Sequence, residues 1–363
     1  MERFRTENTL NAMTSLLDPI GVGELMLPNR IIMSPLTRLR GTANHVPTPL
    51  MAEYYRQRAG AGLIISEGVP VDPMGVGYAQ VPGIWSAEQV EAWKPITQAV
   101  HEAGGRIFMQ IWHVGRISHP LFLDGRLPVA PSAVKPKGNV SLVRPVTEFV
   151  TPRALETTEV KDVVEQFRRG AQNAQAAGFD GVELHGANGY LLDQFLQDGT
   201  NKRTDEYGGP VENRARLMLE CADAAASVFG PGRVGMHLEP HSPSHDMHES
   251  DPWGTFSYVF RELGKRKLAF LCVRDPLGPE HWGRTIKEAF GGVVVTNDGY
   301  TRETAEQVIE SGDADAVAFG KLFLANPDLP LRFAKQAELN APVPTTFYAH
   351  GAEGYVDYPA MEA

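Results

Sequence analysis

The chain has 363 residues, of which 42% are hydrophobic and 21% charged, and it carries a formal net charge of −10 at pH 7. This composition is typical of a soluble globular protein, and no apolar run approaches the roughly 18 residues that a membrane span requires. The acidic charge disfavours a nucleic-acid partner, and two cysteines are too few for a disulfide framework or a four-cysteine metal centre.

The N-terminal part of the chain divides into a tail and a hairpin. Residues 1–13 lack the continuous apolar core of a secretion signal, so we interpret them as a frayed polar extension of a cytoplasmic protein. The segment LLDPIGVGELMLPNRI follows, with two apolar arms around Gly21–Gly23. It predicts a β-hairpin that plugs the N-terminal mouth of the fold described next.

Short apolar runs alternate with helical periodicity from residue 30 to residue 337, which is typical of a parallel sheet wrapped by helices. Eight such units can close a (β/α)₈ barrel, and we expect residues 14–363 to form this single domain. The predicted strands are Arg30–Pro35, Gly62–Glu67, Arg106–Trp112, Asp180–His185, Arg233–Leu238, Lys267–Val273, Val293–Thr296 and Ala314–Phe319.

One connection is much longer than the others. Residues 113–155 form a stretch of about 40 residues with six prolines between the third predicted strand and the next helix, too long for an ordinary connection in a barrel. We expect this insertion to contain short strands of its own and to cap the active face. The next helix is predicted by an apolar stripe that includes Val160, Phe167 and Ala171, with Gly178 at its C-terminal end.

The fourth predicted strand ends in chemically informative residues. His185 points to the side opposite Leu184 at the C-terminal end of the strand, and Asn188 and Tyr190 follow directly. A histidine and an asparagine in these positions can donate hydrogen bonds to one carbonyl oxygen, while the tyrosine can protonate a nearby carbon. For an isolated motif, capping of a strand-to-helix turn is the better interpretation.

The other strand ends favour a binding site. They carry groups suited to the edge of a planar ring, namely Pro35, Leu36, Thr37, Gly68 and Gln110. Asp298 and Gly299 precede one of the last helices, and Gly320 and Lys321 precede another, where barrels often hold a phosphate on helix N-termini.

These residues belong to longer motifs that resemble the Old Yellow Enzyme family of FMN-dependent ene-reductases. The resemblance extends from about Leu16 to Met361. Its motifs, in the order of the family, are LDPIGVGELMLPNRIIMSPLTR, PGIWSAEQVEAWKPIT, FMQIWHVGRISHP, HGANGYLLDQFLQDGTNKRTDEYGGPVENRARL, ADAVAFGKLFLANPDLPLRF and FYAHGAEGYVDYP.

The resemblance implies a cofactor, a substrate class and roles for the residues. FMN would be bound by Pro35, Leu36, Thr37, Gly68 and Gln110, and would be reduced by NADPH or NADH. An α,β-unsaturated carbonyl or nitro compound would then take hydride at its β-carbon. Its carbonyl would bind His185 and Asn188, and Tyr190 would protonate its α-carbon. Tyr78 and Tyr348 match positions that line the substrate pocket of the family; for either alone, core packing is the simpler interpretation. A small activated alkene is thus the expected partner, and the chain could be a monomer or a homo-oligomer.

Three positions differ from the common residues of the family. His237 replaces an arginine beside the flavin, so we hypothesise that flavin reduction is favoured when His237 is protonated. Asp298 replaces a frequent glycine at the phosphate, and Lys321 replaces an arginine. An ammonium cannot bind phosphate in the bidentate manner of a guanidinium, so we expect weaker FMN retention.

Other functions remain open. The stretch HLEPHSPSHDMHES contains His237, His241, His245 and His248, but its prolines prevent a helix that would align the imidazoles, so we prefer a solvated loop to a metal site. A flavin barrel could instead act as a nitro or nitrate-ester reductase or as an isomerase, or bind flavin without turnover. The alternative without flavin is a metal- or phosphate-dependent barrel lyase.

Overall fold

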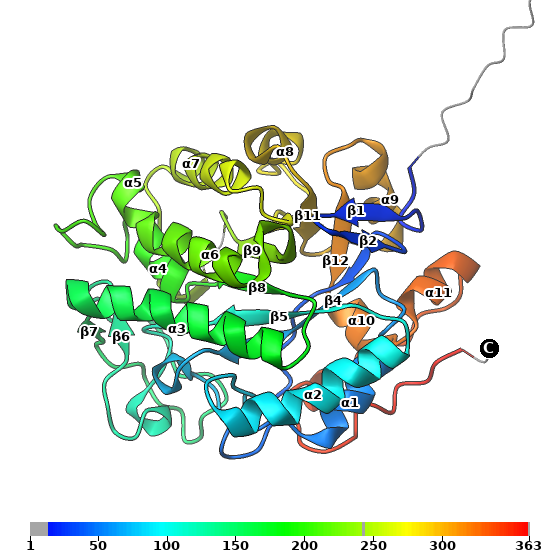
Figure 1. Ribbon diagram of the computed structural model, residues 1–363, viewed down its shortest axis with the longest axis horizontal. Helices are drawn as coiled ribbons and strands as arrows, with labels where there is room; N and C mark the ends of the chain where they lie inside the picture. Colours follow the sequence, from blue (N-terminus) through cyan, green and yellow to red (C-terminus); the bar gives the residue numbers. More distant parts are fainter. Residues whose placement is uncertain (1–13, 242–243, 362–363) are drawn as a thin grey trace, which may run out of the picture.

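A closed barrel of eight parallel strands forms the centre of the computed structural model, which describes residues 14–241 and 244–361 (Figure 1). The predicted extension at residues 1–13 lies outside the described residues. All eight predicted strands are present, and each pairs with its neighbours in chain order. They are β3 (Ile31–Met33), β4 (Leu63–Pro70), β5 (Ile107–Trp112), β8 (Gly181–Gly186), β9 (Val234–Leu238), β10 (Phe270–Arg274), β11 (Val294–Asn297) and β12 (Ala316–Phe319).

The barrel strands are buried on both faces, which explains why their sequences are nearly continuous apolar runs. Alternate residues, among them Ile32, Leu63 and Phe108, form an apolar cluster inside the barrel. The intervening residues, among them Ile64 and Met109, pack in the cluster that includes the outer helices. The strand β4 extends beyond its predicted end, with a shift in its pairing with β5 between Ile65 and Gly68.

The helices surround the barrel as the sequence periodicity predicts. Ser86 Oγ accepts a hydrogen bond from the backbone N–H of Gln89 at 3.2 Å, which caps α2 (Ala87–Glu102). Gly178, with φ of +87°, follows the end of α3 (Thr157–Ala176). The described helices are α1 (Pro49–Arg56), α2 (Ala87–Glu102), α3 (Thr157–Ala176), α4 (Leu191–Leu196), α5 (Val211–Arg214), α6 (Arg216–Phe229), α7 (Pro252–Lys265), α8 (Arg284–Phe290), α9 (Arg302–Glu310), α10 (Lys321–Ala325) and α11 (Leu329–Lys335).

An antiparallel hairpin precedes the barrel, formed by β1 (Ile20–Val22) and β2 (Leu25–Leu27). Ile20 and Leu27 join the apolar cluster inside the barrel. The backbone N–H of Glu24 donates to the carbonyl of Gly232 at 3.1 Å, just before β9 begins. The hairpin therefore lies at the amino-terminal ends of the strands.

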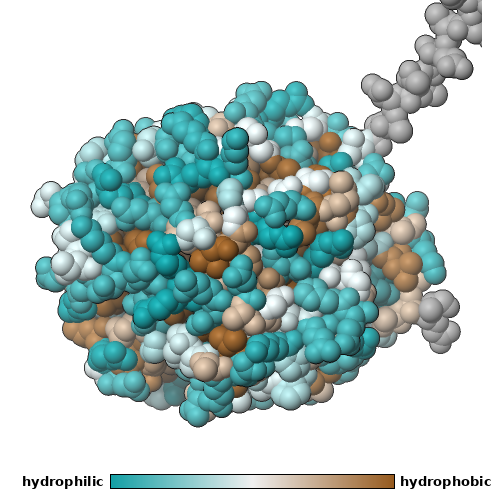
Figure 2. Space-filling model, viewed as in Figure 1, coloured by the Kyte–Doolittle hydropathy of each residue, from teal (hydrophilic) through white to brown (hydrophobic). Residues whose placement is uncertain are grey.

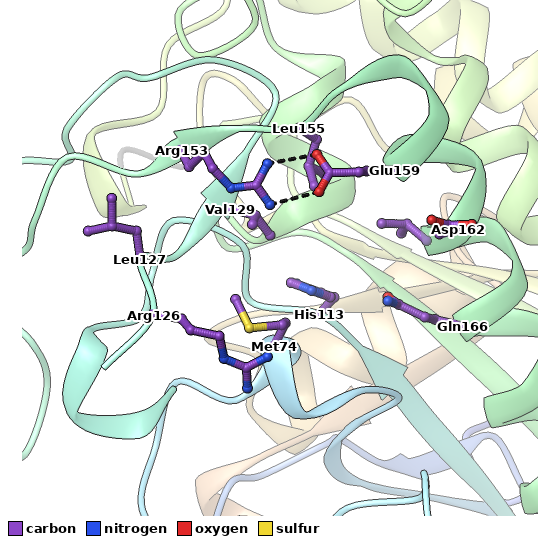
Figure 3. A pocket seen from close by; sticks show the side chains of 11 residues that line it. Met74, His113, Arg126, Leu127, Val129, Arg153, Leu155, Glu159, Asp162 and Gln166 are labelled. Carbon is purple, nitrogen blue, oxygen red and sulfur yellow. Dashed lines mark hydrogen bonds and ion pairs between the residues drawn. The ribbon is translucent and has the colours of Figure 1, made fainter. Parts of the chain in front are cut away.

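The insertion after β5 contains two short parallel strands, β6 (Val129–Ala130) and β7 (Arg153–Ala154). Figure 1 shows them on the opposite side of the molecule from β1 and β2. The Arg153 guanidinium donates to both carboxylate oxygens of Glu159 on α3, at 2.7 and 2.9 Å, beside a cavity of about 490 Å³ (Figure 3). From the same insertion, Val140 and Phe149 pack in one apolar cluster with Trp112.

The C-terminal segment is fixed to the loop after β3 by two buried arginines. Arg38 donates to the carbonyls of Phe347 and Gly354 at 3.0 and 2.6 Å, and Arg40 donates to Phe347 at 3.0 Å. The ring of Tyr355 stacks on Tyr54, with centroids 4.1 Å apart. This packing holds the segment that carries Tyr348 near the C-terminal ends of the strands.

The surface agrees with the polar composition of the chain. The face in Figure 2 is mainly hydrophilic, with apolar side chains in scattered patches. In the described ranges, no helix has both the length and the apolar character needed to cross a bilayer.

Candidate active site

A cavity of about 650 Å³ opens at the C-terminal ends of the barrel strands, a size suited to a cofactor. It brings together every predicted catalytic and cofactor residue. These are Pro35, Leu36, Thr37, Gly68, Gln110, His185, Asn188, Tyr190, His237, Asp298, Gly299, Gly320 and Lys321. Residues from distant parts of the sequence meet here because the C-terminal ends of parallel strands share one rim.

A tight turn after β8 positions Asn188. Its backbone has a φ of +58°, in the left-handed region that asparagine tolerates better than most residues. The backbone N–H of Asn188 donates to Glu239 Oε2 at 3.0 Å, and its carbonyl accepts from His245 Nδ1 at 2.6 Å. The turn is thus held from both sides by residues that follow β9, and the strained backbone is supported by the loop opposite it.

Four rings stand side by side, from Tyr78 through Trp112 and His185 to His237, and the last three line the cavity. Successive ring centroids are 5.8, 5.7 and 5.5 Å apart, and each pair is within 14° of parallel. Tyr190 lies edge-on to His185, with centroids 5.0 Å apart. Close packing on both faces therefore fixes the orientation of the His185 imidazole.

The two predicted tyrosines of the substrate pocket lie in different surroundings. The hydroxyl of Tyr78 is 2.7 Å from the hydroxyl of Tyr190, so the two share a hydrogen bond. Neither Tyr78 nor Tyr348 is among the residues that line the cavity, and Tyr348 is 48% exposed. It is still near enough for its charge to raise the pKa of both Tyr78 and Tyr190.

Burial sets the protonation of the residues after β8. It raises the pKa of Tyr190 well above its usual 10, with a further contribution from Tyr78. It lowers the pKa of His185 well below 6.5, and the nearby His237 and Arg274 lower it further. At neutral pH the site therefore holds a neutral imidazole and a protonated phenol.

Burial disfavours the protonated form of His237 and so argues against the hypothesis that this residue titrates near neutral pH. Burial, together with the charge of Arg274, lowers the pKa of His237 to about 3. The Gln110 side-chain nitrogen, which can only donate, lies 3.3 Å from His237 Nδ1. We therefore assign the proton of His237 to Nε2, which is buried and has no hydrogen-bond partner among the described residues.

Sequence reasoning missed Arg274, which also lines the cavity. It is the last residue of β10, one position beyond the predicted end of that strand. Its guanidinium lies 2.6 Å from Glu239 Oε1 and 3.0 Å from Asp298 Oδ2. A polar residue at the C-terminal end of a predicted barrel strand was the signal that could have identified it.

The histidines of residues 237–248 do not converge. His245 is half-buried and packs against Tyr190, with centroids 5.5 Å apart, so solvent does not surround this residue of the loop completely. Among the described residues, the one cluster with metal-ligand spacing is Glu183, His237 and Cys272. Burial raises the pKa of Glu183 to about 8 and that of the Cys272 thiol well above 9. Both groups are protonated at neutral pH, which disfavours metal binding.

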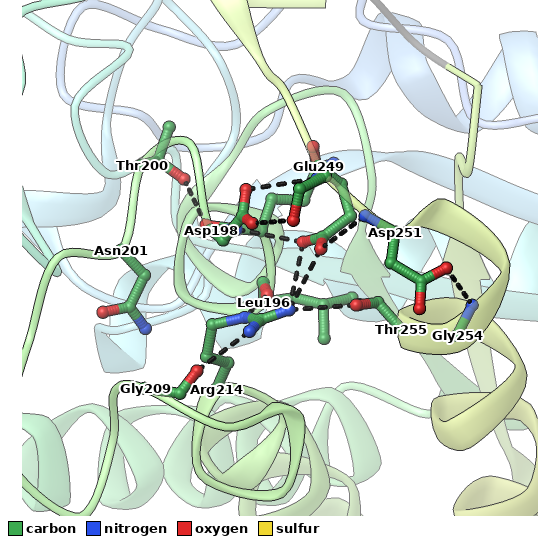
Figure 4. Close-up of polar contacts among 12 residues, drawn as sticks. Leu196, Asp198, Thr200, Asn201, Gly209, Arg214, Glu249, Asp251, Gly254 and Thr255 are labelled. Atoms are coloured by element: carbon green, nitrogen blue, oxygen red, sulfur yellow. Dashed lines mark hydrogen bonds and ion pairs between the residues drawn. The ribbon is translucent and has the colours of Figure 1, made fainter.

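The loop that carries His245 is anchored by a buried ion pair (Figure 4). Arg214 Nη2 donates to both carboxylate oxygens of Glu249, at 3.1 and 3.2 Å, and to Thr255 Oγ1 at 2.9 Å. Glu249 also accepts from the backbone N–H of Asp198 at 3.0 Å. Arg214 therefore connects the polypeptide after α4 with the loop after β9.

The donors around the cavity fit FMN, the cofactor that the family resemblance implies. The hydroxyl of Thr37 and the unpartnered Nε2 of His237 can donate to a ring with several hydrogen-bonding atoms, and the amide oxygen of Gln110, whose nitrogen contacts Glu183 and His237, can accept from it. Lys321 and the backbone of Gly320 lie at the end of β12, where a phosphate would be bound. The cavity also has room for the whole nucleotide.

Comparisons with known proteins agree with this fit. Residues 15–340 match the model of the NADH:flavin oxidoreductase / NADH oxidase family. The chain is 42% identical over 365 residues to 12-oxophytodienoate reductase 1 of Oryza sativa subsp. japonica, covering 97% of this chain and 94% of the relative.

Two solved structures are also similar. One is an old yellow enzyme homologue from Zymomonas mobilis, with 43% identity, a TM-score of 0.93, and coverage of 96% of this chain and 100% of that one. The other is morphinone reductase in complex with tetrahydroNAD, with 47% identity, a TM-score of 0.92, and coverage of 96% and 98%. The chain therefore belongs to the NADH:flavin oxidoreductase / NADH oxidase family, the family of Old Yellow Enzyme, and is an NAD(P)H-dependent FMN oxidoreductase.

Proposed function

We propose that this chain is an ene-reductase that saturates the activated carbon–carbon double bond of small α,β-unsaturated carbonyl or nitro compounds. Bound FMN would supply the hydride, which it would obtain from NADH or NADPH. The observation that carries the proposal is the convergence of His185, Asn188 and Tyr190 on one cavity wall. The names of two relatives, a reductase of an oxo-dienoate and a reductase of morphinone, support the same substrate class.

In this proposal His185 and Asn188 bind the carbonyl oxygen. His185 is neutral and therefore donates a hydrogen bond without a full positive charge. Donors held at the oxygen stabilise the negative charge that develops there as hydride arrives at the β-carbon, an effect worth about 3 kcal/mol for one well-placed donor. The row of stacked rings and the bond from Asn188 to Glu239 keep both donors in place before the substrate binds.

Tyr190 is the proposed proton donor to the α-carbon. Its phenol stays protonated over the physiological pH range because its pKa is raised well above 10. The hydroxyl of Tyr78, at 2.7 Å, can orient the Tyr190 hydroxyl. Tyr78 is thus a positioning residue in this scheme, and Tyr190 the acid.

Stopped-flow kinetics of the holoenzyme test the proposed carbonyl clamp, which is the pair of hydrogen bonds from His185 and Asn188 to the substrate carbonyl oxygen. The protein is reduced with NADPH without oxygen and is then mixed with 2-cyclohexenone or with ferricyanide, which takes single electrons and needs no carbonyl clamp. Replacing both His185 and Asn188 by alanine should slow reoxidation of the flavin by the enone by at least 10²–10³-fold, because the loss of a single well-placed donor already slows such reactions by about this factor. Reoxidation by ferricyanide should stay within about twofold. Equal loss with both acceptors, or no loss with the enone, contradicts the proposed clamp.

A further inference from the structure

The charges around the cavity are unevenly distributed. Among the described lining residues, only Arg274 and Lys321 carry a permanent positive charge. Lys321 is exposed at the end of β12, on the side assigned to the phosphate. His237 faces the cavity from β9 as a neutral ring. The part of the cavity between β9 and β11 therefore depends on Arg274 for any fixed positive charge.

The position of Arg274 follows from the alternation of residues along β10. Cys272 joins the apolar cluster inside the barrel, and Val273 packs in the cluster that includes the outer helices. Arg274 therefore points inward again, one layer above Cys272. In the sheet, Cys272 pairs with His237 on β9 and Arg274 pairs with Asn297 on β11. The side chain of Arg274 thus enters the cavity one layer above His237.

Two carboxylates hold the guanidinium in this position. Glu239, which lies 2.6 Å away, also accepts the backbone N–H of Asn188. Asp298, which lies 3.0 Å away, shares the cavity wall. Asp298 has a φ of +92°, a conformation that an aspartate rarely adopts. Burial is the main cause of the lowered pKa of His237 and of His185, and the positive charge of Arg274 lowers both further, so this charge reaches both rings.

We propose that Arg274 is the residue that stabilises the reduced, anionic ring of FMN in this chain, and that Glu239 and Asp298 hold Arg274 and offset part of its charge. The redox potential of bound FMN rises when a nearby positive charge favours the anionic reduced form over the neutral oxidised form. His237 then contributes a hydrogen bond from Nε2 and no charge. The inference rests on FMN binding and does not depend on which substrate the enzyme reduces.

The matched variants Arg274→Gln and Asp298→Asn test this inference. Both variants break the ion pair between Arg274 and Asp298, but Arg274→Gln removes a positive charge and Asp298→Asn removes a negative charge. We expect Arg274→Gln to weaken the preference for reduced over oxidised FMN by about tenfold, or about 30 mV for a two-electron couple. We expect Asp298→Asn to raise the potential, and Arg274→Lys to retain the wild-type value. The midpoint potential is measured by spectroelectrochemical titration at saturating FMN without substrate, so failure of the ene-reductase proposal would not affect it.

Replacing His237 by glutamine, which can still donate a hydrogen bond, provides the second control. We expect His237→Gln to leave the potential within about 10 mV of wild type, roughly a twofold change in the equilibrium, because the imidazole is already neutral. The inference is overturned if Arg274→Gln and Asp298→Asn shift the potential in the same direction or not at all. It is also overturned if His237→Gln lowers the potential as much as Arg274→Gln. If Arg274→Gln does not retain FMN, the sign of the Asp298→Asn shift decides the outcome.

Discussion

Replacing Tyr190 by phenylalanine removes the proposed acid and changes little else. The phenylalanine ring can keep the edge-on contacts with Trp112 and His185, whose centroids lie 4.9 and 5.0 Å from that of Tyr190. The structural loss is the 2.7 Å hydrogen bond with Tyr78, which contributes about 1 kcal/mol to stability. The loss of a general acid is larger, about 10²–10⁴-fold in rate, or roughly 3–5 kcal/mol of activation free energy.

Two half-reactions separate these effects. In Tyr190→Phe, NADPH should reduce the flavin at a rate close to wild type, whereas reoxidation by 2-cyclohexenone should slow by about 10²–10⁴-fold. Tyr78→Phe breaks the same hydrogen bond and retains the acid, so we expect it to slow reoxidation less than about tenfold. The wild-type rate of reoxidation should be constant from about pH 6 to pH 9, because the pKa of Tyr190 lies well above 10. Equal effects of the two variants would refute the assignment of Tyr190 as the acid.

Three further predictions concern cofactor binding and stability. Lys321→Arg should bind FMN more tightly, since a guanidinium can contact phosphate in a bidentate manner; fluorescence titration of the apoprotein measures this, and equal dissociation constants would count against it. Burial raises the pKa of Glu183 from 4.5 to about 8, so wild type loses stability as pH rises through this window and Glu183→Gln does not. Urea unfolding near pH 5 and near pH 9 measures the free energy of unfolding of both proteins. The stability of Glu183→Gln relative to wild type should be higher at pH 9 than at pH 5, and an equal difference at the two pH values would contradict this. Arg214→Ala leaves the Glu249 carboxylate buried and unpaired and should cost about 3–5 kcal/mol of unfolding free energy; a loss below about 1 kcal/mol in the same assay would contradict it.

The barrel and the composition of its rim could be predicted from the sequence. Strands buried on both faces need uninterrupted apolar runs, and such runs can be counted without coordinates. The residues after them share one rim because all the strands are parallel. For this reason Pro35, Gln110, His185 and Lys321 were placed in one site although they are far apart in the sequence.

Features that depend on side-chain direction and burial could not be predicted. The neutral state of His237 results from desolvation, and the role of Arg274 depends on where its guanidinium meets Glu239 and Asp298. Likewise, no local pattern indicates that His245 supports the carbonyl of Asn188, because the two residues are separated by 57 positions. Tyr78 and Tyr348 matched motifs, but neither is among the residues that line the cavity.

The most direct test of the proposed function is one anaerobic turnover with product analysis. Holoenzyme is reduced with one equivalent of NADPH, mixed with excess 2-cyclohexenone, and examined by absorbance and by gas chromatography with mass spectrometry. We predict that the flavin spectrum returns to the oxidised form and that one cyclohexanone is formed per FMN. A flavin that stays reduced, or a product that is 2-cyclohexenol instead of cyclohexanone, would contradict the proposal that the enzyme delivers hydride to the β-carbon of an enone.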